Sequence, residues 1–135
     1  MAAVLVGTSP AQAADGADAY ARRCAACHQP DGAGAVSLAP PLRTPVFKKL
    51  GTHAPGYIVS ILLAGMVGQD IDGESYVAAM PDWSALSDEE IAAIARFVLA
   101  DFNDLEVAVT PEEVAASRKN KLQSEDIIRL RSSVQ

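Results

Sequence analysis

Both cysteines of the chain fall within one pentapeptide, Cys24-Ala25-Ala26-Cys27-His28. The order C-x-x-C-H is the attachment signature of haem c. The two thiols add to the two vinyl groups of the porphyrin, and two intervening residues on a helical turn give the sulfur atoms the separation of those vinyls. The imidazole of His28 is then held beneath the ring, where its Nε2 can bind iron. The pentapeptide therefore predicts one haem c, bound covalently through thioethers to Cys24 and Cys27.

Three other uses of the same spacing are open. A thioredoxin-like redox pair would need a βαβ context, and the sequence has none. A structural zinc site needs four ligands, and outside the pentapeptide the chain offers only His53 as a further histidine or cysteine. A disulfide that closes a very small loop is the third. The histidine directly after Cys27 favours haem over all three.

Length and composition agree with a cofactor protein. The chain has 135 residues, enough for one domain or for one small domain with a tail. Half of the residues are hydrophobic, yet only 5% are aromatic, which is thin for a self-sufficient core unless a large apolar group adds its bulk. No run of eighteen apolar residues is present, so no membrane-spanning helix is expected. The net charge of -6 argues against nucleic acid and anionic membranes as partners.

The first thirteen residues resemble the end of an export signal. Small apolar residues lead to Ala11-Gln12-Ala13, a pattern that signal peptidases cut, although the first basic residue is Arg22 and a positive start is missing. We expect residues 1–13 to be the remnant of a signal and the mature chain to begin near Ala14. A short disordered terminus is the alternative. Export would place the protein in a bacterial periplasm.

The rest of the chain reads as all-α with long loops. Helices are expected over 15–27, over 55–64 with a stop at Gly65, and from a Ser87–Glu90 capping box to about Phe102. Residues 29–50 and 65–79 are rich in glycine or proline and are expected to be irregular. Two short helices are expected in the tail, starting at Pro111 and Ser124. No strand is expected.

The chain resembles the class I cytochrome c family over about residues 15–102. The resemblance rests on the pentapeptide and on four further features, which are Gly16 with Tyr20, Pro40-Pro41-Leu42, Ala79-Met80-Pro81 and the helix that carries Phe97. It implies a cytochrome c-like fold of short helices and long loops around one haem, in which Tyr20 and Phe97 join the first and last helices. The expected division is a cytochrome c domain over 14–103 and a helical C-terminal extension over 104–135.

A low-spin haem iron needs a second axial ligand besides His28. Met80 lies 52 residues after His28, in an irregular stretch that Pro81 makes rigid. A loop of that length can return to the far face of the ring, so Met80 is the preferred candidate, with Met66 and His53 as alternatives. The resemblance also implies that the Pro40 carbonyl accepts the other N–H of His28. Tyr57 and Trp83 are candidates for hydrogen bonds to a haem propionate, or are core residues.

These features predict a monohaem single-electron carrier and not an enzyme. Histidine and methionine together would close both axial positions of the iron, which leaves no open site for catalysis. The expected partners are redox proteins, a donor dehydrogenase and an acceptor oxidase or cytochrome, docked beside four acidic residues, which are Asp70, Asp72, Glu74 and Asp82. The tail resembles those of cytochrome subunits of periplasmic dehydrogenases, and is expected to wrap the body or grip a partner. A haem-based sensor or peroxidase-like domain with a displaceable distal Met80, and a haem-free disulfide protein, are the alternatives.

Overall fold

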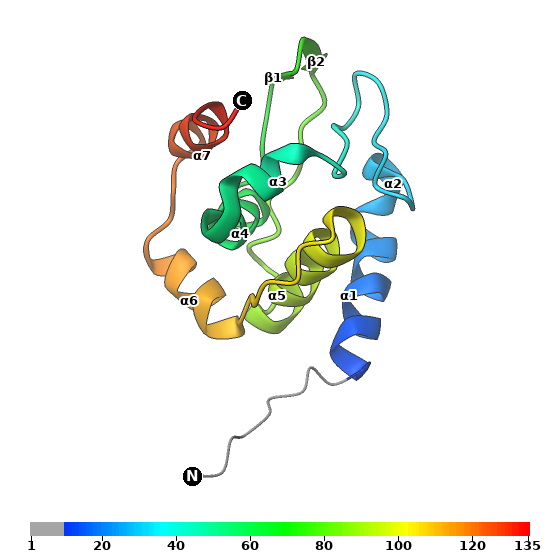
Figure 1. Cartoon of the computed structure of the whole chain (residues 1–135), viewed down its shortest axis with the longest axis vertical. Coiled ribbons are helices and arrows are strands. Elements are labelled where there is room, and N and C mark those ends of the chain that lie inside the picture. The colour runs from blue at the N-terminus through cyan, green and yellow to red at the C-terminus, as the bar shows by residue number, and fades with distance from the viewer. Residues whose placement is uncertain (1–9) are drawn as a thin grey trace.

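A computed structural model describes residues 10–135 of the chain, and it describes side chains from residue 15 onward. Of the predicted signal remnant, 1–13, residues 1–9 lie outside the described residues, whereas residues 10–13 form the start of α1. Figure 1 shows a helical body with a small hairpin at one end. The α-helices are α1 (Pro10–Arg23), α2 (Ala25–His28), α3 (Pro45–Leu50), α4 (Ala54–Ala64), α5 (Asp88–Phe97), α6 (Pro111–Lys119) and α7 (Ser124–Ser132). Within the described range, no helix is both long and apolar enough to cross a membrane.

The first and last helices of the body, α1 and α5, cross in direct contact, as expected. Gly16 of α1 lies so close to α5 that a Cβ there would come within 2.6 Å of the Ala93 carbonyl oxygen. The Tyr20 and Phe97 rings lie 5.2 Å apart between centroids, and Phe102 adds a third ring 5.1 Å from Tyr20. Because α1 ends at Arg23, this crossing fixes where the pentapeptide 24–28 begins.

Local capping signals set the start of α5. The Ser87 hydroxyl accepts a hydrogen bond from the Glu90 amide at 3.1 Å, as a capping box requires. The Glu90 carboxylate does not return to the Ser87 amide, because it accepts a hydrogen bond from Arg23 Nε at 2.7 Å. The predicted capping box therefore has only the Ser87 bond, and the Glu90 carboxylate instead links α5 to the end of α1. The helix continues as a π-helical turn over Val98–Phe102, so its predicted end is confirmed.

Two stretches that were expected to be irregular contain regular structure, so that expectation was wrong. The 29–50 stretch ends in α3, whose N-cap Thr44 accepts from the Val46 amide at 3.3 Å, with Pro45 in the first turn. The 65–79 stretch contains an antiparallel hairpin of β1 (Gln69–Ile71) and β2 (Glu74–Tyr76). Three-residue strands are too short to show an alternating pattern, and the turn dipeptide Asp72-Gly73 is the one signal for them.

The C-terminal extension packs on the body. The Thr110 capping box that begins α6 is fully formed. Helix α6 lies against α4 and α5, and α7 lies against α4, as Figure 1 shows in orange and red. Val114 of α6 and Ile127 of α7 are completely buried in the same hydrophobic core as α4 and α5. Of the two expectations for the tail, the structure shows the one in which it wraps its own body.

Candidate haem site

One cavity collects residues from almost every element of the fold. It has a volume of about 310 Å³, within the range of about 300–1,000 Å³ that is usual for small-molecule and cofactor sites. Its walls are predominantly apolar and come from α2, the 38–44 loop, α4, the hairpin and the segment around Met80. Such a slot suits a flat apolar group that also carries a few polar substituents.

The pentapeptide forms one part of this wall. Cys24 is the N-cap residue of α2, and Cys27 and His28 lie within that helix. Both cysteines are free thiols that line the cavity, Cys24 buried and Cys27 exposed. Burial raises the pKa of the Cys24 thiol to about 11. The two thiols are not joined in a disulfide, and both line the same cavity.

The His28 imidazole is oriented from behind. His28 is 7% exposed, and its Nδ1 lies 2.9 Å from the Pro40 carbonyl oxygen. A carbonyl can only accept, so Nδ1 carries the proton and donates it, which leaves Nε2 with a free lone pair. Burial lowers the pKa of His28, against the opposing effect of the bond to Pro40. Neutral imidazole with Nε2 unprotonated is the form that binds a metal.

Gly34 brings the Pro40 carbonyl to this position. Its φ of +71° is readily adopted by glycine, and a Cβ there would lie 2.8 Å from the Pro40 oxygen and 2.5 Å from the Ala39 oxygen. The Gly34 amide also donates to the His28 carbonyl at 2.9 Å. The loop after His28 is therefore hydrogen-bonded both to the backbone and to the imidazole of the histidine.

Met80 and Met66 both line the cavity, and their backbones are paired. Each amide donates to the carbonyl of the other residue, at 3.1 and 2.8 Å. The Trp83 amide donates to the Leu62 carbonyl at 2.7 Å, which ties the segment after Met80 to the end of α4. Met66 is 9% exposed and belongs to the hydrophobic core, whereas Met80 is half-buried at its edge.

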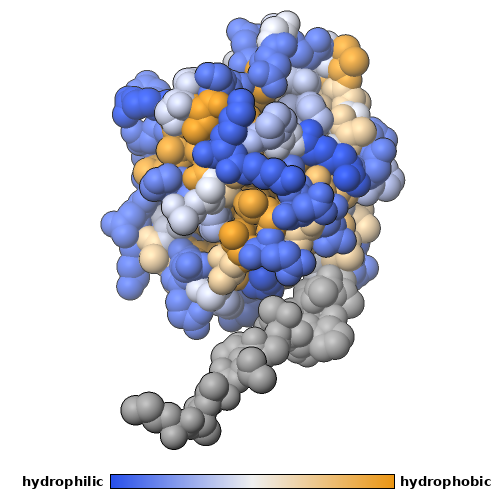
Figure 2. All heavy atoms as spheres, in the orientation of Figure 1, coloured by the Kyte–Doolittle hydropathy of each residue, from blue (hydrophilic) through white to orange (hydrophobic). Residues whose placement is uncertain are grey.

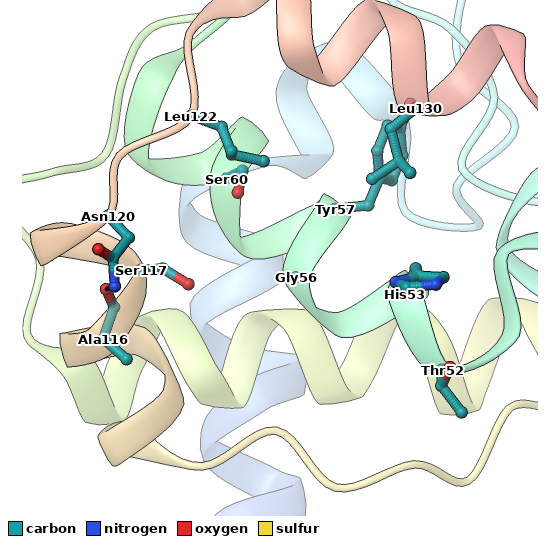
Figure 3. Close-up of a pocket in the computed structure, with 10 residues that line it drawn as sticks. All are labelled: Thr52, His53, Gly56, Tyr57, Ser60, Ala116, Ser117, Asn120, Leu122 and Leu130. Atoms are coloured by element: carbon teal, nitrogen blue, oxygen red, sulfur yellow. Dashed lines mark hydrogen bonds between the residues drawn. The ribbon is translucent and has the colours of Figure 1, made fainter.

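His53 lies outside this cavity. It lines a separate hollow of about 340 Å³ between α4, α6 and α7, shown in Figure 3, and its side chain is exposed. Tyr57 of α4 borders both spaces, and it lines the hollow of Figure 3 together with Leu130 of α7. Of the three candidates for a second axial ligand, the structure brings Met80 and Met66 to the cavity that holds His28.

The cavity also contains a residue that the sequence analysis missed. Arg131 of α7 lines it and is 5% exposed. Arg131 lies in the tail, beyond the resemblance, and no motif marks it. Tyr57 and Trp83, both noted in the sequence, line the cavity too, and the Arg23 guanidinium lies over the Trp83 ring at 5.8 Å from its centroid.

The residues present fit a covalently attached haem. The cavity supplies apolar walls, two free thiols, an imidazole with Nε2 available and a thioether, all in one space. The buried Arg131 Nε has no hydrogen-bond partner among the described residues, which suits a group that brings its own carboxylates.

Comparisons with known proteins agree with this chemistry. The pattern of the family described as "Cytochrome C oxidase, cbb3-type, subunit III" matches residues 11–98. A cytochrome c-552 of Thermus thermophilus is 34% identical over an alignment that covers 95% of this chain and 90% of that protein. The cytochrome c subunit of the quinone alcohol dehydrogenase of Gluconacetobacter polyoxogenes is 32% identical over 79% of this chain, but over 22% of its own length.

These matches span the pentapeptide, the helices that frame the cavity and, in the first relative, nearly the whole chain. They bear out the predicted all-α, cytochrome c-like fold and the covalent haem c. The chain belongs to the cytochrome c family, and is a haem-binding electron carrier and not an enzyme.

Proposed function

We propose that Cys24 and Cys27 carry the two thioether bonds and that His28 and Met80 are the axial ligands of the haem iron. The observation that supports this most strongly is the His28–Pro40 hydrogen bond, because it turns Nε2 away from the loop in a cavity that Met80 also lines. Bound haem supplies a one-electron couple between ferrous and ferric iron. Imidazole and thioether ligation raises the potential of that couple.

Met80 is favoured over Met66 by how its backbone is held. Pro81 has a fixed φ directly after Met80, and the Trp83 amide anchors the chain beyond it, whereas the reciprocal backbone pairing holds Met66 and Met80 equally. A ligand on such a segment would move little between the two oxidation states. The Met66 side chain, by contrast, fills part of the hydrophobic core, which is the usual role of methionine.

We further propose that the protein is a periplasmic single-electron carrier between a dehydrogenase or other redox enzyme and a downstream acceptor. The export-like start over 1–13 and the similarity to a dehydrogenase cytochrome subunit support this role. We assign residues 14–103 to the cytochrome domain and 104–135 to an extension that is packed on it. The acidic residues Asp70, Asp72 and Glu74 on the hairpin are exposed or half-buried, which suits a docking face for a positively charged partner.

Substitution of each methionine by leucine tests the ligand assignment. In haem-loaded ferric protein, Met80→Leu should abolish the sulfur-to-iron charge-transfer absorption, and the ferrous form should gain carbon monoxide binding. Met66→Leu is the matched control, because it removes a cavity-lining thioether of the same size and should leave both properties unchanged. Loss of the absorption in Met66→Leu but not in Met80→Leu would contradict the assignment.

A sensor or peroxidase-like protein would need Met80 to leave the iron readily. The backbone bonds at Met66 and Trp83 argue for a fixed Met80. Carbon monoxide separates the two functions, because the wild-type ferrous carrier should not bind it near neutral pH, whereas a protein with a displaceable methionine should.

A further inference from the structure

Arg131 is a buried cation without a counter-charge. It lies on α7, is 5% exposed and lines the haem cavity. One of its nitrogens, Nη2, donates to Gln69 Oε1 at 3.2 Å, and the buried Nε has no partner in the described part of the chain. No carboxylate within the described range forms an ion pair with it. A buried, unpaired guanidinium is strongly unfavourable, so its position calls for an anion.

The neighbouring groups of the chain do not supply that anion. Apart from the pentapeptide, the charged and titratable residues along the cavity are Tyr20, Arg23, Tyr57, Asp72, Tyr76 and Arg131. Asp72 is the one carboxylate among them; it is exposed, and it accepts a hydrogen bond from the Gln135 amide at 3.2 Å. Tyr57 lies close to Arg131; burial raises the pKa of Tyr57, and the Arg131 guanidinium partly offsets that rise through its charge and a side-chain hydrogen bond. The neighbouring tyrosines are neutral near pH 7.

We propose that Arg131 binds a propionate carboxylate of the haem. This rests on the proposed function, since it requires a haem in the cavity. Haem carries two propionates, and a guanidinium presents a planar set of N–H donors that matches a carboxylate. Arg131 lines the cavity, and its buried Nε has no hydrogen-bond partner among the described residues, so the guanidinium keeps at least one N–H donor unused. The C-terminal extension thus contributes a binding residue to the cofactor site and does more than cover α4.

The reduction potential reports this contact. The ferric haem carries one positive charge more than the ferrous haem, so a buried guanidinium disfavours the ferric form and raises the potential. Arg131 also holds the pKa of its propionate below the usual carboxyl range. Without the guanidinium, the propionate would titrate at a higher pH, and its protonation would raise the potential as the pH falls.

Arg131→Gln and Arg129→Gln form a matched pair for the test. Both remove one positive charge from α7, but the Arg129 side chain is 75% exposed and pairs with Asp126. At pH 7 and a fixed solution potential, haem-loaded Arg131→Gln should have a ratio of ferrous to ferric protein about tenfold lower than wild type. For a one-electron couple this equals a reduction potential lower by about 59 mV. Its potential should also fall with rising pH between about pH 5 and 7, whereas the wild-type potential stays flat. Arg129→Gln should behave as wild type.

Equal potentials and pH profiles for the two variants, in folded and haem-loaded protein, would overturn the proposal. If Arg131→Gln does not fold, a crystal structure of the wild-type holoprotein decides, because Arg131 should lie within about 3.2 Å of a propionate oxygen. A guanidinium directed to Asp72 or to solvent would refute it. Protein that carries no covalent haem would instead refute the proposed function, and the two failures are therefore distinguishable.

Discussion

Gly65 determines how closely the Met80 segment approaches α4. Its φ is +68°, and a Cβ there would lie 2.7 Å from the Met80 carbonyl oxygen and 2.9 Å from the Asp82 amide nitrogen. Both neighbours are backbone atoms on a segment that is hydrogen-bonded to the end of α4, so neither can move alone. Glycine at this position therefore sets the place of the proposed axial ligand.

Gly65→Ala should displace Met80 and weaken the sulfur-to-iron charge-transfer absorption of the ferric protein. Gly51→Ala is the matched control, because Gly51 has a similar φ of +55° and open space where a Cβ would stand, and it does not line the haem cavity. Backbone strain of about 1 kcal/mol is common to both substitutions, so a difference between them measures the steric contact alone. Identical ferric spectra for the two variants would show that the close approach does not position Met80.

Phe97 should be the aromatic residue on which the α1–α5 crossing depends. It packs 5.2 Å from both Tyr20 and Phe102, in a half-buried position. We expect Phe97→Ala to lower the free energy of unfolding by about 3 kcal/mol, at the lower end of values for buried aromatic residues. Denaturant unfolding of the haem-loaded protein measures this. Val77→Ala, at a position 78% exposed, should cost less than about 0.5 kcal/mol. Unchanged stability in Phe97→Ala would reject the packing.

At the scale of elements, α6 is tied to the start of α5 by one side chain. Arg118 donates to the Asp88 carboxylate at 2.6 Å and to the Ser84 and Leu86 carbonyls at 2.6 and 2.5 Å. Three bonds from one planar group hold the loop that precedes α5 against the extension. They involve a charge and are only partly exposed, so they stabilise more than a typical surface pair.

We expect Arg118→Ala to lower the free energy of unfolding by about 1–2 kcal/mol, the usual contribution of hydrogen bonds to a charged group. Lys119→Ala is the control, since its side chain is exposed on the next position of the same helix. Chemical unfolding followed by circular dichroism compares the two. Equal midpoints would indicate that the extension adheres to the body through its apolar residues alone.

The elements that the sequence predicted are those with local signals at their ends. Pro55 and Gly65 bound α4, Ser87 begins α5, and Thr110 with Pro111 begins α6, and each of these helices forms where it was expected. The hairpin was missed because its strands are held by pairing between segments, which no single segment records. Helix α3 was missed because the prolines around it obscured the Thr44-Pro45 start signal.

At the scale of the whole molecule, the site combines residues from both ends of the chain. The pentapeptide predicts covalent haem attachment. Pro81 and the sequence distance from His28 favour Met80 as the second axial ligand. The place of Arg131 follows from how α7 folds back on α4, which depends on tertiary packing of residues such as Ile127. A sequence pattern therefore gives the attachment point of the cofactor but not the tail residue at its cavity.

The net charge of the chain is -6, and three of its acidic residues lie on the hairpin. Figure 2 shows a mostly hydrophilic face with small hydrophobic patches. The hairpin carboxylates of Asp70, Asp72 and Glu74 accept hydrogen bonds from Ser75, Gln135 and Ser37 respectively. Amide replacements can accept the same bonds, so these acids can be neutralised with little structural change.

The combined variant Asp70→Asn, Asp72→Asn, Glu74→Gln should associate about tenfold more slowly at low salt with a redox protein of positive net charge, because electrostatic steering is lost. Its rate should also depend less on ionic strength. Stopped-flow electron transfer over a salt series measures both. Glu106→Gln, Glu112→Gln, Glu125→Gln removes the same charge at other exposed positions and should change the rate less. Equal effects of the two triple variants would place docking elsewhere.

An alkaline pyridine haemochrome assay combined with the intact mass measures whether one haem is bound covalently through Cys24 and Cys27. The protein should be expressed with an export signal and a haem c maturation system. We expect one haem c per chain and a mass equal to that of the polypeptide plus one haem. Denaturation should not release the haem, because it is bound covalently. Colourless protein with the mass of the bare polypeptide would show that Cys24 and Cys27 carry no haem.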